Sequence, residues 1–95
     1  MKGLMQDHPL LISSIFEHAI NNYPTQEIVS NSVEGGIHKY TYKDWGNRTK
    51  KLANALKEFG ILSGDRIGTL AWNGYRHLEL YYATSSSGLI CHTMN

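Results

Sequence analysis

The sequence has few of the features that mark secreted, membrane-embedded or nucleic-acid-binding proteins. Cys91 is the single cysteine, so the chain can form no internal disulfide, which fits a reducing compartment such as the cytoplasm. The net charge is only +1, from 9 basic and 8 acidic residues, which gives no field to attract nucleic acid or an anionic membrane. We therefore expect a soluble cytoplasmic protein without a nucleic-acid partner.

The sequence also lacks an apolar run long enough for a signal peptide or a membrane span. The most apolar stretch near the start, residues 10–16, is interrupted by Ser13–Ser14 and followed by Glu17. With 41% hydrophobic and 18% charged residues, the composition is ordinary for a globular protein. The 95 residues suffice for one small domain, and we expect no integral membrane segment.

Local patterns in the first half predict a helix and then a β-hairpin. The segment Ser14-Ile-Phe-Glu17 has the spacing of a capping box and predicts the start of a helix that ends before Pro24. Gly35–Gly36 supplies a turn between two short strands, over residues 27–33 and 37–42. The residues expected on the apolar face of the helix are Ile15, Phe16, Ala19, Ile20 and Tyr23.

A second and longer helix is predicted after the hairpin. Thr41 is suited to cap it, and Asp44 would lie near the positive end of the helix dipole. Gly60 stands where a glycine commonly ends a helix. Gly46, inside the helix, costs about 1 kcal/mol relative to alanine, so packing must compensate for it. The expected apolar face consists of Trp45, Thr49, Leu52, Ala53, Leu56 and Phe59.

The last third of the chain predicts a strand, a helix and a second strand. Residues 66–72 are apolar or small in the middle, which is typical of a strand covered by helices on both faces. Asn73–Gly74 interrupts the strand, a helix is expected over 75–87 before Gly88, and the second strand covers 89–94. Such a βαβ unit has parallel strands and a right-handed crossover. The predicted fold class is therefore α/β, with helices, one β-hairpin and one βαβ unit.

Three motifs invite a functional interpretation, and each favours a structural one. Asn73–Gly74 lacks the further glycines of a dinucleotide-binding loop and favours a helix N-cap with a tight turn. The segment 85–88, three serines and a glycine, resembles the start of a phosphate loop, but no lysine follows, so close helix–sheet packing is favoured. Cys91 and His92 are adjacent on a strand and would point to opposite faces, which predicts a core position for Cys91.

The remaining polar residues provide no catalytic constellation. The histidines lack the spacing of a zinc site, and no Gly-x-Ser-x-Gly motif supports a hydrolase triad. A basic helix surface is interpreted as a solvated face, because no aromatic residues are interleaved for base stacking. No catalytic, cofactor-binding or metal-binding residue is therefore assigned in the sequence. The histidines are His8, His18, His38, His77 and His92, and the basic residues of this helix surface are Arg48, Lys50, Lys51 and Lys57.

Four stretches, by their order and spacing, resemble the beginning of the adenylate-forming enzymes. The most specific is Gly60-Ile-Leu-Ser-Gly-Asp-Arg-Ile-Gly68. The last is similar to the fatty-acyl-CoA synthetase branch, in which His-Thr-x-Asn is usually followed by Pro-Arg-Leu. The resemblance covers nearly the whole chain, from about residue 11. The four stretches are Tyr40-Thr-Tyr-Lys-Asp-Trp45 with Leu52–Gly60, Gly60–Gly68, Asn73–Gly88, and Leu89-Ile-Cys-His-Thr-Met-Asn95.

The resemblance implies the start of the large N-terminal domain of an AMP-forming acyl-CoA synthetase, a fatty-acid–CoA ligase. Such an enzyme uses ATP and Mg²⁺ to activate a carboxylic acid as an acyl-adenylate and transfers the acyl group to CoA; a homodimer is one arrangement open to it. The ATP-binding P-loop and the catalytic lysine of the family would lie beyond Asn95, so residues 1–95 are expected to be a truncated, inactive and self-associating piece. The alternative is a self-contained α/β module that binds a small ligand or a partner without catalysis.

Overall fold

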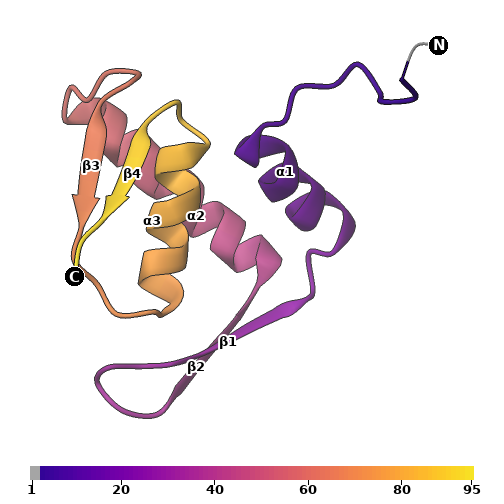
Figure 1. Cartoon of the computed structure of the whole chain (residues 1–95). Coiled ribbons are helices and arrows are strands. Elements are labelled where there is room, and N and C mark those ends of the chain that lie inside the picture. Colours follow the sequence, from indigo (N-terminus) through magenta and orange to yellow (C-terminus); the bar gives the residue numbers. More distant parts are fainter. Residues whose placement is uncertain (1–2) are drawn as a thin grey trace.

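Three helices and four strands follow one another in the computed structural model, which describes residues 3–95 (Figure 1). Two of the strands form an antiparallel hairpin, and the other two form a parallel pair connected by a helix. The predicted α/β fold class, with one hairpin and one βαβ unit, is confirmed. The elements are α1 (Ile12–Asn22), β1 (Glu27–Asn31), β2 (Ile37–Thr41), α2 (Tyr42–Glu58), β3 (Arg66–Thr69), α3 (Tyr75–Ser85) and β4 (Ile90–Thr93).

The hairpin forms where the paired glycines predict it. Its register runs from Glu27 opposite Thr41 to Asn31 opposite Ile37, so each strand is slightly shorter than expected. Gly35 and Gly36 have φ values of +99° and +80°, a region that side chains with a Cβ rarely adopt. The turn prediction is confirmed in its position and in its physical reason.

Helix α1 begins earlier than its capping pattern predicts. The residue at the N-cap position is Leu11, which has no side chain able to cap the helix. Ser14 is already inside the helix, and its backbone N–H donates to the carbonyl of Leu11 at 3.1 Å. The capping-box prediction at Ser14 is therefore wrong. Phe16 is the buried residue of the expected apolar face, whereas Ile15 and Tyr23 are exposed.

Helix α2 begins and ends at the predicted signals. The backbone N–H of Asp44 donates to Oγ1 of Thr41, and the backbone N–H of Thr41 donates to Oδ2 of Asp44, both at 3.2 Å. These bonds complete a capping box. The backbone N–H and the hydroxyl of Thr41 both donate to the carboxylate of Asp44 and hold its pKa below its ordinary value. Gly60 has a φ of +82°, as a helix-ending glycine requires. Phe59 lies beyond the helix end and is 84% exposed, so its predicted place on the apolar face is wrong.

The core lies where the three helices meet. The ring centroids of Phe16 and Trp45 are 4.8 Å apart, and those of Trp45 and Tyr82 are 4.9 Å apart, both in edge-to-face geometry. Each of these rings comes from a different helix, so the cluster holds α1, α2 and α3 together. Among the helices described, none is both long and apolar enough to cross a membrane.

The parallel pair of strands is covered on one side. Strand β3 pairs with β4 from Arg66 opposite Ile90 to Thr69 opposite Thr93, and α3 packs against both. Beyond Thr69 the chain leaves the sheet, and Leu70 and Trp72 are exposed. The strand is therefore shorter than the predicted 66–72, and among the residues described only α3 is seen to cover it. Helix α3 likewise ends at residue 85 rather than 87.

Gly46 allows α1 and α2 to approach closely, and this explains a glycine inside a helix. A Cβ at this position would lie 2.8 Å from Cγ2 of Ile20. This methyl group is attached to the branched Cβ, close to the backbone, and cannot move far. We expect Gly46→Ala to lower the free energy of unfolding, because overpacking of about 1–3 kcal/mol outweighs the ~1 kcal/mol gained in helix propensity. Urea unfolding followed by circular dichroism measures the change.

The neighbouring position provides the control. Asn47 is exposed on the same helix, so Asn47→Ala should gain helix propensity without a clash and unfold at equal or higher urea concentration. In the Ile20→Ala background, Gly46→Ala should lose most of its destabilising effect. An increase in stability for Gly46→Ala like that of Asn47→Ala would contradict the packing argument.

Candidate functional site

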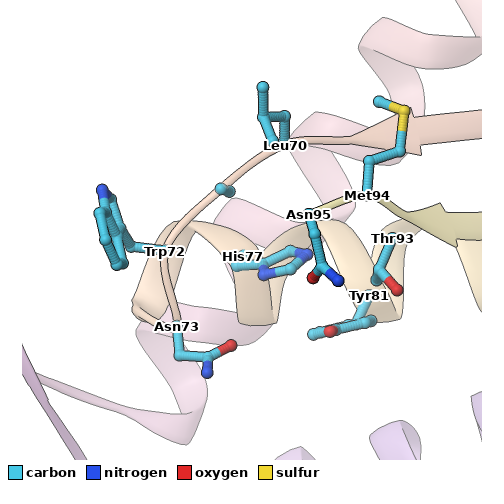
Figure 2. Close-up of a pocket in the computed structure, with 9 residues that line it drawn as sticks. Leu70, Trp72, Asn73, His77, Tyr81, Thr93, Met94 and Asn95 are labelled. Carbon is cyan, nitrogen blue, oxygen red and sulfur yellow. The ribbon is translucent and has the colours of Figure 1, made fainter.

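A pocket of about 600 Å³ lies at the carboxyl ends of β3 and β4 (Figure 2). In open α/β sheets, ligands bind preferentially outside the carboxyl ends of the strands. The pocket is therefore the candidate site of the residues described. It is lined by Leu70, Ala71, Trp72, Asn73, His77, Tyr81, Thr93, Met94 and Asn95.

Three parts of the βαβ unit supply the lining. The connection from β3 to α3 contributes residues 70–73, and the end of β4 contributes residues 93–95. Helix α3 contributes His77 and Tyr81, which are four residues apart and therefore share one face of the helix. Their rings stack with centroids 4.3 Å apart at an interplanar angle of 21°. The helix thus presents a flat aromatic surface to the pocket (Figure 2).

His77 joins α3 to the end of β3. Its side chain is buried, and Nε2 lies 3.0 Å from Oγ1 of Thr69, which is buried as well. Within residues 3–95, Nδ1 of His77 is buried without a hydrogen-bond partner. A buried imidazole without a charged neighbour in contact orients groups by hydrogen bonding, and here it fixes the helix against the strand.

The pocket lining contains no Asp, Glu, Lys or Arg side chain. Its polar groups are the amides of Asn73 and Asn95, the hydroxyl of Thr93 and the imidazole of His77. Such groups hydrogen-bond neutral partners, and the apolar side chains around them favour apolar contact. The lining includes no Lys or Arg for a phosphate.

A second polar cluster is more deeply buried and lies between α2, α3 and β2. Glu79 is 5% exposed and accepts hydrogen bonds from Nε of Arg48 at 2.7 Å and from the hydroxyl of Tyr40 at 3.0 Å. Burial and the charge of Glu79 raise the pKa of Tyr40 well above its ordinary value. The hydrogen bond to Glu79 likewise raises the pKa of Arg48. The cluster is an ion pair that fixes the packing of three elements.

The structure tests the remaining predictions about polar residues. The cap position of α3 is Gly74, so the prediction of a helix N-cap at Asn73–Gly74 is confirmed, although no side chain caps the helix. Cys91 is half-buried, and His92, next to it on β4, is exposed, which agrees with opposite faces of a strand. In the segment 85–88, Ser87 and Gly88 are exposed, and the fully buried small residues of α3 lie just before it. The packing role predicted for this segment belongs mainly to those residues, Ala83 and Thr84.

The roles of His77 and Arg48 in these two clusters were not predicted from the sequence. His77 is one of five histidines without metal-site spacing, and Arg48 is one of four basic residues expected on a solvated face. Arg48 is exposed like Lys50, Lys51 and Lys57, as predicted, but it also pairs with the buried carboxylate of Glu79. The one local signal for His77 was its spacing of four residues from Tyr81, which places two aromatic rings on one helical face.

The sequence itself identifies the class of protein. The sequence model of the AMP-binding enzyme family matches residues 16–95, and the chain belongs to this family. It is 43% identical over 95 residues to the 3-methylmercaptopropionyl-CoA ligase of Ruegeria lacuscaerulensis. It is 42% identical over 95 residues to the medium-chain-fatty-acid–CoA ligase of Ectopseudomonas oleovorans. The long-chain-fatty-acid–CoA ligase of Thermus thermophilus is 35% identical over 91 residues. The resemblance to this family is confirmed.

These relatives are much longer than the chain. The match covers 100% of the chain but 18% of the Ruegeria protein, and 100% of the chain but 17% of the Ectopseudomonas protein. It covers 96% of the chain and 17% of the Thermus protein. The chain therefore spans less than a fifth of the length of the relatives it matches.

Among residues 3–95, no three His, Cys, Asp or Glu side chains are grouped closely enough to hold a metal ion. The pocket at the strand ends lacks a cation for a triphosphate. We therefore assign no chemical step through ATP or Mg²⁺ to these side chains.

The buried carboxylate of Glu79 gives a testable prediction about stability. Glu79→Gln keeps the shape but removes the charge that Arg48 and Tyr40 face, and we expect the free energy of unfolding to fall by about 1–3 kcal/mol. Urea unfolding measures this change. The control is Glu17→Gln, which removes an exposed contact of 3.9 Å with Lys50 and should change the free energy of unfolding by less than about 1 kcal/mol. Equal losses for the two variants would contradict the role assigned to Glu79.

Proposed function

We propose that the chain is part of an ATP-dependent, AMP-forming ligase that activates a fatty or related carboxylic acid and transfers it to CoA. The observation that supports this proposal is the identity of 43%, 42% and 35% to three relatives that are named CoA ligases. These relatives are named for different acids, so the proposal is for the class of acid–thiol ligases and not for one acyl chain.

The proposed reaction has two steps. The substrate carboxylate attacks the α-phosphorus of ATP, which forms an acyl-adenylate and releases pyrophosphate. The thiol of CoA then attacks the acyl carbonyl, which forms the thioester and releases AMP. ATP, Mg²⁺ and CoA are the cofactors and partners expected for the whole enzyme in the cytoplasm, and their binding residues are expected in the rest of the polypeptide.

Residues 3–95 are proposed to act as scaffold in this enzyme. Their buried polar groups are engaged in structure: Glu79 pairs with Arg48 and Tyr40, and His77 contacts Thr69. The hydroxyl of Thr69 and the imidazole of His77 lie within hydrogen-bonding distance, but both are buried, and Nδ1 of His77 has no third group to orient the ring as a catalytic base requires. We therefore propose that the 95-residue chain is inactive by itself.

The first experiment compares the 95-residue chain with the product of the complete reading frame that encodes it. Each is incubated with ATP, Mg²⁺, CoA and carboxylic acids of increasing chain length, and AMP and acyl-CoA are measured by chromatography. We expect both products from the complete polypeptide and only background from the 95-residue chain. Acyl-CoA formed by the short chain would contradict the scaffold role, and a complete polypeptide inactive with every acid would contradict the ligase proposal.

We also propose that the 95-residue chain associates with itself in isolation. The parallel pair of strands leaves apolar side chains exposed, with Leu70 at 75% and Trp72 at 80%. Exposed strand edges and apolar patches favour association with another chain. The net charge of +1 adds little repulsion between copies.

Light scattering at increasing concentration tests this association. The mass of the 95-residue chain should rise above the 10.7 kDa of a monomer in the high micromolar range. Leu70→Lys should restore the monomer because it places a charge on the exposed end of the sheet. Leu10→Lys, at a position 94% exposed in the N-terminal segment, is the matched control and should leave association unchanged. A monomeric wild-type chain, or dissociation caused only by Leu10→Lys, would count against this surface.

A further inference from the structure

A cavity of about 270 Å³ lies between β1 of the hairpin and the first two turns of α3, and we call it the hairpin cavity. Residues 28–30 of β1 form one wall, and the start of α3 with Asn73 before it forms the other. Figure 2 shows Asn73 and His77 together at this end of the helix. Because Asn73, His77 and Tyr81 also line the pocket at the strand ends, the two hollows adjoin there.

The start of α3 has backbone N–H groups without an acceptor beside this cavity. The first bond along the helix runs from the N–H of Leu78 to the carbonyl of Gly74, at 3.1 Å. The N–H groups of Tyr75, Arg76 and His77 precede it, and no side chain of the residues described caps this end. The first turn of the helix also contains no acidic residue. The positive end of the helix dipole is therefore open to an anion.

Two buried side chains add polar groups that have no partner within residues 3–95. His77 is 4% exposed, and its Nε2 lies 3.0 Å from Oγ1 of Thr69. Side chains lean toward the N-terminus of their helix, so Nδ1 is turned to the start of α3. When Thr69 donates to Nε2, the ring hydrogen is on Nδ1, which is then a donor without an acceptor. Across the cavity, Oγ of Ser30 on β1 is buried without a partner as well.

These donors select a ligand with a single negative charge. A helix end carries about half an elementary charge, and the cavity lining contains no Lys or Arg, so a carboxylate suits it better than a triphosphate. The charged side chains near the start of α3 are already paired. Arg76 contacts Glu34 at 2.8 Å, and Arg48 contacts Glu79 at 2.7 Å. The remaining lining is mostly apolar or aromatic and suits an alkyl chain: Ile28, Val29, Tyr75, Leu78 and Tyr81.

We propose that the hairpin cavity binds a short-chain carboxylic acid, with the carboxylate at the start of α3 and the alkyl chain between α3 and β1. The carboxylate accepts hydrogen bonds from the free backbone N–H groups, from the hydroxyl of Ser30 and from Nδ1 of His77. The volume is just below the ~300 Å³ at which pockets for drug-sized ligands begin, so the chain is short. The choice of a carboxylic acid rests on the proposed function, because such acids are the substrates of the proposed ligase. The site is separate from the reaction, and binding there stabilises the contact between the hairpin and α3 as the acid accumulates.

The test is photo-labelling of the complete polypeptide with a hexanoic acid that carries a diazirine on its alkyl chain. Mass spectrometry locates the label, which we expect on residues 28–30 and 73–81 and which excess hexanoate, but not hexanol, should suppress. Ser30→Ala should reduce this labelling about tenfold, because it removes a hydrogen bond to a charged group. Ser30→Asp places a carboxylate of the protein in the cavity and should reduce it at least as much. Ser87→Ala removes an exposed hydroxyl just beyond the other end of α3 and should change it less than about twofold.

Several outcomes would overturn the inference. A label found only outside these two segments would show that the cavity does not bind the acid. Equal suppression by hexanol would reduce the cavity to an apolar hollow, and stronger suppression by inorganic phosphate would show an anion site without a place for the chain. Labelling of the 95-residue chain but not of the complete polypeptide would assign the site to a carboxylate of the polypeptide itself.

The same samples separate this inference from the proposed function. A complete polypeptide that forms acyl-CoA but takes up no label in the hairpin cavity would reject the acid site alone. One that is labelled there, with the expected loss in Ser30→Ala, but forms no acyl-CoA would reject the ligase proposal alone.

Discussion

The arrangement of the chain depends on one buried carboxylate. Glu79 is 5% exposed, and a charge removed from water to this extent must be paired and hydrogen-bonded. Its partners, Arg48 and Tyr40, come from α2 and β2, so a single side chain on α3 fixes the helix against both. The same orientation of α3 turns His77 toward Thr69 and places the stacked rings below the ends of the strands. The ion pair and the contact between His77 and Thr69 thus both orient α3, the helix that lines the candidate site.

The sequence predicts this structure well where the cause is local and poorly where it is tertiary. Thr41 and Asp44 are three residues apart, and Gly60 suits the positive φ of the turn that ends the helix. These roles could therefore be inferred from short sequence patterns. The partners of Glu79 lie 31 and 39 residues away, and no local rule selects Arg48 from among the basic residues of its helix. The capping pattern at Ser14 did not predict the start of α1, because the helix already begins at Ile12, two residues earlier.

The candidate site, too, could be predicted from the sequence only in part. The β–α–β order predicted parallel strands, but neither the pocket at their carboxyl ends nor the side chains that line it was predicted. The apolar residues 66–72 also predicted cover on both faces, and one of those faces is exposed in the residues described. This mismatch has a simple explanation under the proposed function: the strand pattern suits a sheet in a protein more than five times as long. The family could be identified from the sequence, since order and spacing of motifs do not depend on that missing cover.

The aromatic cluster has a consequence for the order of events during synthesis. Phe16, Trp45 and Tyr82 all lie within the first 82 residues, and so do Arg48 and Glu79. On a ribosome that makes a polypeptide of the relatives' length, every member of this core has emerged before most of the chain is translated. The three helices can then dock while later segments are still being made, since chains fold from the N-terminus as they appear. The exposed side of the β3–β4 pair would then be the last surface to be buried, after those later segments have been synthesised.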